Sequence, residues 1–265
     1  MLNQTPTKFH QHEFVEIAII VEGSAIQVYG DMEFEVTKGD VFVIRPDHPH
    51  TLKKTRKLNI CNILFMDDGS IPLLDGLIET PGFRALFQLE PAMRKNDDPQ
   101  RRLKLNSTQF DEVITLASRM KTALLTKTSS NPTVATIHLL ELITTLCTAY
   151  ADMPTQESKT LTQLSLAVSH IEANFKEEIR VDDLARKASM SVRTFQRHFQ
   201  QTFGVPCSKY LLKHRLSEAR RLLEVSDASV ADIGFQSGFE DTTYFSRAFR
   251  KETGTSPLKY RDSLG

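Results

Sequence analysis

The sequence predicts an α+β protein of two domains, an N-terminal β-barrel that carries a helical hairpin and a C-terminal all-α domain with two helix-turn-helix motifs. Three observations support this prediction: β-branched segments within the first 65 residues, helical periodicity after residue 70, and one pattern that occurs twice near the C-terminus. With 265 residues the chain is long enough for both domains. We place the first domain at residues 1–150, a linker at 151–160 and the second domain at 161–265.

The composition is typical of a soluble globular protein, with 40% hydrophobic and 25% charged residues. The formal net charge is +0, and residues 161–265 contain 16 Lys and Arg against 13 Asp and Glu, so charge alone does not identify a partner. The three cysteines, Cys61, Cys147 and Cys207, form no C-x-x-C pair, which fits a reducing cytosol. The N-terminus lacks an apolar signal-like segment and no apolar run approaches a membrane span, so we expect a cytoplasmic protein with no membrane partner.

Short segments rich in β-branched residues lie between Phe14 and Phe65, at the spacing of a small sandwich or barrel. Three dipeptides of turn-forming residues separate these segments: Gly23-Ser24, Gly30-Asp31 and Gly39-Asp40. We therefore expect a turn between strands at each of the three dipeptides.

Two amphipathic helices are predicted at about 108–127 and 133–150, on either side of a break at Asn131-Pro132. Their apolar residues recur at helical spacing: Phe110, Val113, Ile114, Ala117, Met120 and Leu124, then Val134, Ile137, Leu140, Ile143 and Cys147. These apolar faces exceed what a small barrel needs, so the hairpin either forms an interface with another molecule or packs only on its own barrel.

One pattern occurs twice with identical internal spacing, which indicates a duplicated unit. The copies are Phe195-x-Arg197-x-Phe199 with Gly204 and Lys209-Tyr210, and Phe245-x-Arg247-x-Phe249 with Gly254 and Lys259-Tyr260. On a helix, two Phe residues four apart lie on one face, and the Arg between them points away. Each copy therefore contains a helix with a buried aromatic side and an exposed basic side.

In the first copy, Asp182 and Asp183 lie in the first turn of a helix, where carboxylates complement the helix dipole. Ser189-Met190 forms a turn, and Ser191 is the N-cap of a second helix at about 192–203. The exposed face of that second helix carries Arg193, Gln196, Arg197 and Gln200. Because Arg can bind guanine and Gln adenine in the major groove, this arrangement predicts a DNA-binding helix-turn-helix.

The second copy repeats the arrangement, with Ser229 as a cap, Asp232 in a capping-box position and Gly238 in the turn. Its second helix at about 241–252 presents Asp241, Thr242, Thr243, Ser246, Arg247 and Arg250. A connecting helix with Pro206 at its N1 position would span about 25 Å and could place both units in successive major grooves of double-stranded DNA. The alternative is that these polar faces are only solvated.

Residues of about 163–262 resemble the DNA-binding domain of the AraC/XylS family of bacterial transcription regulators, above all in IGFQSGFEDTTYFSRAFRKETGTSPLKYR. The resemblance implies base contacts at Arg193, Gln196, Arg197, Asp241, Thr242, Thr243 and Arg247, and we include Gln200 and Ser246 in the predicted DNA-binding set. It also implies a homodimer formed through the helical hairpin, and an activator that recruits RNA polymerase. Gly234 stands where the family often has Ala, which weakens that short helix slightly.

The N-terminal region contains His10-x-His12-x3-Glu16-x6-Gly23, followed by Gly39-Asp40-x5-Pro46-x3-His50. The first three polar residues share parity, so in a strand they point the same way, and His50 of a neighbouring strand could meet them. The pattern resembles the two cupin motifs, whose β-barrel uses these positions for a metal. The second motif is one residue short before His50, and Pro46-Asp47-His48 lacks the usual glycine. The first domain is thus predicted to be a cupin-like β-barrel.

Three hypotheses remain open for this cluster. In the first, a small carbohydrate effector is hydrogen-bonded, without any cofactor, by His10, His12, Glu16, Arg45 and His50. The resemblance implies such a carbohydrate site for sensor domains of the family, most closely for the L-rhamnose-responsive subgroup. If Arg45 is not part of the site, it is a cation at the end of a strand. In the second, His10, His12, Glu16 and His50 bind a metal ion, and in the third the histidines are structural. The alternative function is a metal-dependent cupin enzyme with an appended helical domain.

Overall fold

The computed structural model describes residues 9–30, 32–46, 48–66, 76–77, 80–93, 102–126 and 131–263. Asp31 and Asp47, and residue 127 at the predicted end of the first hairpin helix, lie outside these ranges. The chain divides into two compact units, Met1–Ser165 and Leu166–Gly265.

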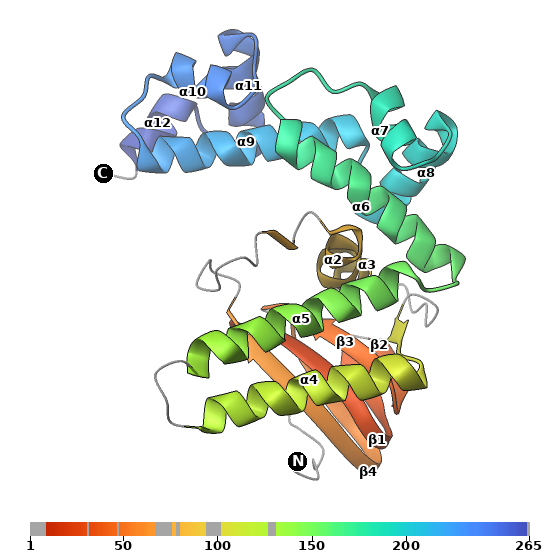
Figure 1. The fold of residues 1–265 in the computed structure, drawn as a ribbon. Coiled ribbons are helices and arrows are strands. Elements are labelled where there is room, and N and C mark those ends of the chain that lie inside the picture. The colour runs from red at the N-terminus through yellow and green to blue at the C-terminus, as the bar shows by residue number, and fades with distance from the viewer. Residues whose placement is uncertain are drawn as a thin grey trace. The chain divides into compact units, whose positions relative to one another are not determined.

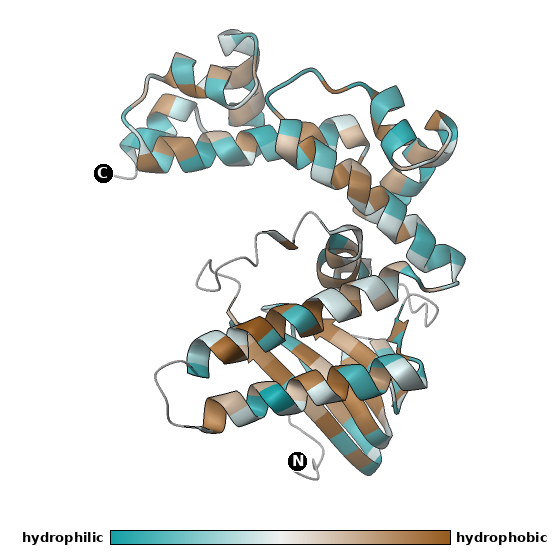
Figure 2. Ribbon diagram, viewed as in Figure 1, coloured by the Kyte–Doolittle hydropathy of each residue, from teal (hydrophilic) through white to brown (hydrophobic). Residues whose placement is uncertain are grey.

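The first unit is built on a five-stranded antiparallel sheet whose strands are rich in hydrophobic residues (Figures 1 and 2). The strands are β1 (Val15–Tyr29), β2 (Met32–Thr37), β3 (Asp40–Ile44), β4 (His50–Phe65) and β5 (Leu103–Lys104). β1 pairs with β4 along its whole length, and its other edge pairs first with β3 and then with β2. The long strand β1 is therefore the central element of the sheet.

The sheet curls until its far ends meet. Glu16 pairs with Leu64 near one end of the β1–β4 ladder, whereas His50 pairs with Tyr29 at the other end. In a flat sheet these ends would be roughly 40 Å apart, yet the Glu16 carboxylate lies 3.5 Å from the His50 ring. His10 closes the curl through a β-bridge to His50. The predicted α+β two-domain class is thus confirmed, with a curled antiparallel sheet in the first unit.

Gly23-Ser24 is not a turn, which corrects the prediction. β1 continues through it, and its register against β4 shifts at this point. Gly23 has a φ of +77°, and a Cβ there would lie 2.3 Å from the carbonyl oxygens of both Arg56 and Lys57. Glycine at a β-bulge removes this clash and allows the strand to bend. The turns predicted at Gly30 and Gly39 are confirmed, both with positive φ.

Two long helices, α4 (Ser107–Leu125) and α5 (Asn131–Ala151), confirm the predicted hairpin and pack side by side (Figure 1). The predicted α5 face is wrong in part, since Val134 is 38% exposed and Ile137 is 51% exposed. The buried residues of α5 are Ala135, Leu139, Leu142, Ile143, Leu146, Cys147, Ala149 and Tyr150. Because α5 is apolar on more than one face, periodicity alone does not identify the side that packs.

By length and composition α5 is apolar enough to cross a membrane, which corrects the prediction that no apolar run approaches a membrane span. Of its most apolar segment, 44% is buried. The helix contacts α2 (Pro81–Arg84) and the following π-helix η1 (Ala85–Leu89), which α3 (Glu90–Met93) extends. A Cβ at Gly82 would lie 2.0 Å from the Cys147 carbonyl oxygen, so α2 and α5 touch through backbone atoms.

In the part of the chain that the structure describes, residues 166–263 are helical and contain no strand, as predicted. The helices are α6 (Gln156–Asn174), which begins in the first unit, α7 (Val181–Lys187), α8 (Val192–Phe203), α9 (Cys207–Val225), α10 (Val230–Gln236), α11 (Thr242–Thr253) and α12 (Pro257–Asp262). The segment 151–160 contains the end of α5, a short non-helical stretch at 152–155 and the first residues of α6.

Candidate nucleic-acid interface and ligand cavity

The duplicated pattern forms two helix-turn-helix units. The first unit is α7 and α8, and the second unit is α10 and α11. Four phenylalanines, two in each second helix, are fully buried: Phe195, Phe199, Phe245 and Phe249. Their burial turns the opposite side of each helix toward solvent, as the spacing predicts. The bounds of α8 are those predicted, and α11 begins one residue later than predicted, at Thr242.

Both second helices end in the same way. Gly204 and Gly254 follow them in the left-handed conformation, with φ values of +69° and +82°. Their backbone N–H groups donate to the carbonyl oxygens of Gln200 and Arg250, which closes the last helical turn.

A tyrosine from the next helix braces each unit. The Tyr210 ring meets the Phe199 ring edge-on at 5.6 Å, and its hydroxyl donates to Glu172 of α6 at 3.0 Å. The matching contacts in the second unit are Tyr260 on Phe249 at 5.6 Å, and Tyr260 to Glu224 of α9 at 2.8 Å. The two units are therefore duplicated in their packing as well as in their sequence.

The second helices begin with polar N-caps. The Ser191 hydroxyl accepts the Thr194 backbone N–H at 3.2 Å, and the Asp241 carboxylate accepts that of Tyr244. Asp241 thus has a structural role in addition to its predicted place in the DNA-binding set. The connecting helix α9 starts at Cys207, with Pro206 as its N-cap rather than its predicted N1 residue.

The exposed sides of α8 and α11 differ in character. On α8 all four predicted residues are exposed: Arg193, Gln196, Arg197 and Gln200. On α11, Thr243 and Arg247 are exposed, whereas Thr242 and Ser246 are half-buried. Tyr244, which the sequence prediction omits, is 49% exposed on the same helix. Tyr244 lies directly before the buried Phe245. The sequence prediction used the aromatic residues of this helix only as signs of its buried side, and so missed that Tyr244 faces solvent.

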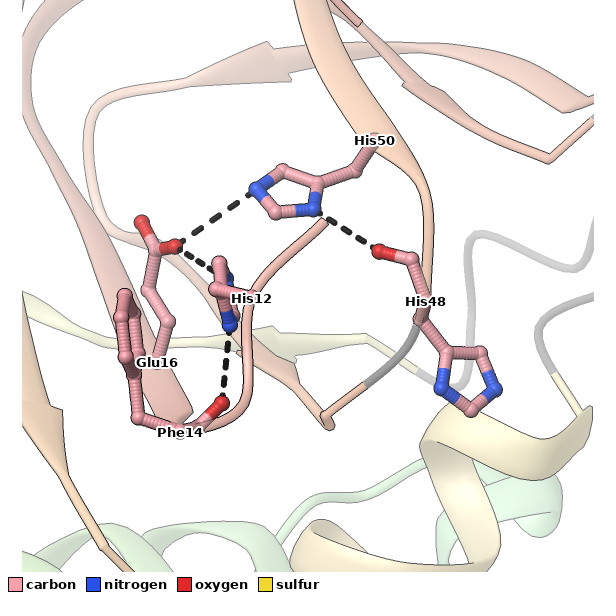
Figure 3. Close-up of polar contacts among 5 residues, drawn as sticks. All are labelled: His12, Phe14, Glu16, His48 and His50. Atoms are coloured by element: carbon pink, nitrogen blue, oxygen red, sulfur yellow. Dashed lines mark hydrogen bonds and ion pairs between the residues drawn. The ribbon is translucent and has the colours of Figure 1, made fainter. Parts of the chain in front are cut away.

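In the N-terminal unit Met1–Ser165, two histidines of the predicted cluster converge on one carboxylate oxygen of Glu16 (Figure 3). His12 Nε2 lies 3.0 Å from Glu16 Oε2, and His50 Nε2 lies 3.5 Å from the same oxygen. Burial alone would raise the pKa of Glu16, but hydrogen bonds and charge from His50 and His12 bring that pKa below its ordinary value. His10 lies beside this group, with its ring 4.4 Å from the His50 ring.

The backbone orients both imidazoles (Figure 3). His12 Nδ1 is 2.9 Å from the Phe14 carbonyl oxygen, and His50 Nδ1 is 3.0 Å from the His48 carbonyl oxygen. A carbonyl oxygen only accepts, so each Nδ1 is the donor. Each Nε2 is left facing Glu16. Two imidazoles with bonded Nδ1 atoms and one carboxylate are a donor set that fits a divalent metal ion of the kind cupin barrels contain.

The cluster forms one wall of a cavity of about 200 Å³. Its lining residues are His10, His12, Phe14, Glu16, Ala18, Gln27, Ile44, His50, Leu52, Ile60, Asn62 and Leu64. Gln27 is only 2% exposed, and its amide nitrogen has no hydrogen-bond partner among the described residues. Sequence analysis missed Gln27 and Asn62 because a polar residue in a strand gives no sign of which face it occupies. Arg45 is not in the lining, and its guanidinium donates to the Phe87 carbonyl oxygen at 3.4 Å.

Comparison with known proteins matches both halves of the chain. A helix-turn-helix domain family matches residues 184–263, and the AraC-like ligand binding domain family matches residues 2–96. The HTH-type transcriptional activator RhaS of Escherichia coli O1:K1 / APEC is 29% identical over 252 residues, which cover 95% of this chain and 86% of that protein. The chain therefore has the two-domain architecture of AraC-type transcription regulators.

Two solved structures are similar to part of this chain. A transcriptional regulator with an AraC-type DNA-binding domain from Chromobacterium violaceum is 36% identical over 39% of this chain and 92% of that chain, with a TM-score of 0.37. The DNA-binding domain of AdpA, solved with a target DNA, is 35% identical over 38% of this chain and 91% of that chain, with a TM-score of 0.37.

These matches decide between the functions that the sequence leaves open. The protein is a DNA-binding transcription regulator with an AraC-like ligand-binding domain and a helix-turn-helix domain. Its relatives are regulators rather than enzymes, so the metal-dependent enzyme alternative has no support.

The α4–α5 hairpin has a groove of about 850 Å³. Both apolar and charged residues line it: Leu116, Ile137 and Leu140, with Asp111, Glu112, Arg119 and Glu141. The exposed apolar residues on the two helices are Leu124, Leu125, Val134 and Ile137. These residues form a surface that the curled sheet does not cover.

Proposed function

We propose that this regulator activates transcription in the cytoplasm in response to a small carbohydrate, L-rhamnose or a related sugar, bound in the cavity of its N-terminal domain. The observation that carries the proposal is a cavity with polar side chains on a largely apolar lining, in a chain whose relatives are named transcriptional activators. We assign residues 1–150 to effector binding and dimerisation, 151–160 to a linker, and 161–265 to DNA binding.

The cavity has the size and chemistry for a monosaccharide. At about 200 Å³ it is smaller than sites for drug-sized ligands, which are roughly 300–1,000 Å³. Glu16, Gln27 and Asn62 offer hydrogen bonds to hydroxyl groups, while Ile44 and Leu52 offer an apolar wall. We include His10, His12 and His50 among the effector contacts.

The effector proposal is tested by thermal unfolding of the full-length protein with a panel of monosaccharides that includes L-rhamnose. One sugar should raise the unfolding temperature, because it binds only the folded state. Gln27→Leu should abolish the shift, whereas Gln236→Leu on the exposed surface of α10 should keep it. If no sugar shifts the transition, the cavity does not bind a carbohydrate.

We infer that α8 and α11 enter the major groove of double-stranded DNA. The contacts are assigned to the residues that the sequence predicts: Arg193, Gln196, Arg197, Gln200, Asp241, Thr242, Thr243, Ser246 and Arg247. The connecting helix α9 has 19 residues and so spans about 28 Å, close to the roughly 34 Å of one DNA turn. Both helices can therefore contact one side of the duplex.

The DNA proposal is tested by selecting binding sites from random duplex DNA and then measuring affinity for variants. Arg197→Ala should cost about 1–3 kcal/mol and relax the preference at one base position. Arg221→Ala is the matched control, an exposed arginine on α9 that is paired with Glu218. A uniform loss across all DNA sequences would place Arg197 on a phosphate instead of a base.

We further propose that the protein is a homodimer through the α4–α5 groove and that it recruits RNA polymerase. The mixture of apolar residues and charges of both signs in the groove supports a self-complementary contact. Ile137→Asp should give monomers in analytical ultracentrifugation, since a charge would be buried in the interface. A dimer that survives this change would place the interface elsewhere.

A further inference from the structure

We propose that His12, Glu16 and His50 bind a divalent first-row transition metal ion in the wall of the N-terminal cavity. This departs from the cofactor-free effector site that the family resemblance implies. It extends the proposed function without resting on it, because the metal is measured with neither effector nor DNA present.

The first step is the position of the hydrogens. Both Nδ1 atoms donate to backbone carbonyl oxygens, at 2.9 Å for His12 and 3.0 Å for His50. A neutral imidazole has a hydrogen on only one of its two nitrogens, so each Nε2 then has only a lone pair. These two lone pairs point at Glu16 Oε2, which as a carboxylate oxygen also only accepts (Figure 3). In the neutral state, three acceptors face one another with no donor between them.

The second step is the burial and convergence of the three ligand atoms. The side chains of His12, Glu16 and His50 are 8%, 8% and 5% exposed, so bulk solvent barely reaches them. The two nitrogens and the carboxylate oxygen all lie within 4.8 Å of one another. A single divalent ion can accept lone pairs from all three at one point.

The third step is the fit of the ligand atoms. Zinc and similar ions bind imidazole nitrogen and carboxylate oxygen at about 2.0–2.2 Å. Two ligands at that distance from one ion lie roughly 3–3.5 Å apart, and the two measured separations are 3.0 Å and 3.5 Å. Two nitrogens and one oxygen favour a transition metal over calcium or magnesium, which prefer oxygen ligands.

The surroundings resemble those of a metal site with an open position. The carbonyl oxygens of Phe14 and His48 fix the imidazole tautomers in the way that outer partners of metal-binding histidines do. Three protein ligands leave at least one position for another molecule. The adjacent cavity contains Gln27, whose amide nitrogen has no partner among the described residues. An oxygen-bearing ligand in the cavity would lie next to the ion.

The test uses the full-length protein after chelator treatment, titrated with Co²⁺ while its visible d–d absorption is recorded. The wild type should give a saturable spectrum that Zn²⁺ abolishes. Glu16→Gln and His50→Gln should each weaken Co²⁺ binding by more than the roughly 10- to 100-fold that loss of an outer partner costs. His48→Gln is the matched control, because His48 contributes only its backbone carbonyl to the cluster. The Co²⁺ affinity of this variant should equal that of the wild type.

Folding is checked separately by near-ultraviolet circular dichroism of each metal-free variant, and Zn²⁺ should raise the unfolding temperature of the wild type but not of Glu16→Gln. Equal Co²⁺ binding by wild type and Glu16→Gln would overturn the proposal, as would the absence of saturable binding by the wild type. Either result leaves the sugar and DNA experiments unaffected, so the two proposals fail independently.

Discussion

The two helix-turn-helix units share their buried residues and differ where they turn and where they face solvent. Both contain two buried phenylalanines, a left-handed glycine after the second helix and a tyrosine bonded to a glutamate. The turn has Ser189 in the first unit and Gly238 in the second, and the second turn is one residue longer before its N-cap. Packing thus constrains the residues on one side of each unit, while the residues on the solvent side are free to differ between the units.

The largest expected effect tests whether the two cores are equivalent. Phe195→Ala and Phe245→Ala should each destabilise the protein by about 3–5 kcal/mol, because each removes a fully buried ring. Urea unfolding of the full chain measures both. Phe203→Ala should cost less, because Phe203 is half-buried and Thr253 replaces it at the matching position. An equal loss at Phe203 would show that the first unit depends on a third aromatic residue.

The second prediction concerns the turns. Gly238 has a φ of +84°, and a Cβ there would lie 2.7 Å from the Phe175 carbonyl oxygen and 2.8 Å from the Lys176 Cα. Gly238→Ala should therefore destabilise the protein by at least about 2 kcal/mol, since backbone strain and a backbone clash add.

The matching position in the first unit already accepts a side chain. Ser189 has a φ of +52°, so Ser189→Gly relieves strain but also raises the entropy of the unfolded chain. The net change should lie within about 1 kcal/mol of zero. If Ser189→Gly and Gly238→Ala had similar effects in thermal unfolding, the two turns would not differ in their contacts.

These elements also show how far sequence reasoning extends. The bounds of α8 could be predicted because its signals are local: a serine N-cap, a phenylalanine pair and a glycine C-cap. The bulge at Gly23 could not, because its cause is the approach of β4 from more than thirty residues away in the chain. The packed side of α5 could not be predicted either, because it depends on where α4 and α2 lie.

The residues of the candidate cavity also fall into those that the sequence could predict and those that it could not. His12, Glu16 and His50 could be found because the spacing of their residue types is distinctive, and the structure brings them together. Gln27 could not, because a glutamine in a strand of this composition has no distinguishing pattern and its burial follows from the curl of the sheet. Arg45 lies at the end of β3 as its position suggests, but its contact is with Phe87 rather than the cavity.

The third prediction compares the N-caps. Ser191→Ala and Asp241→Ala should each cost about 1 kcal/mol, because each leaves a backbone N–H of the second helix without its acceptor. Asp241→Asn should retain stability in urea unfolding, since Asn caps as well as Asp. A loss of stability in Asp241→Asn would mean that the negative charge contributes as well, through the helix dipole.

The smallest effect concerns the tyrosines that brace the two units. Tyr210→Phe should cost about 1 kcal/mol through the lost bond to Glu172, and Tyr260→Phe should cost less because water competes at its exposed site. The hydrogen bond to Glu224, with a smaller contribution from burial, raises the pKa of Tyr260 above its ordinary value of 10.0. A pKa raised in the folded state means that this bond stabilises the protein at and below neutral pH, and that the contribution is lost as the pH rises through the folded pKa.

Ultraviolet titration of the tyrosine phenols measures the pKa of Tyr260 in the wild type and in Glu224→Gln. Removing the carboxylate should lower the pKa of Tyr260 toward the ordinary value, because the glutamine amide no longer favours the protonated phenol to the same extent. Tyr260→Phe identifies which absorption change belongs to this residue. If the titration of Tyr260 is the same in wild type and Glu224→Gln, the brace of the second unit is made by ring packing on Phe249 alone, and the two units differ in how their tyrosines are anchored.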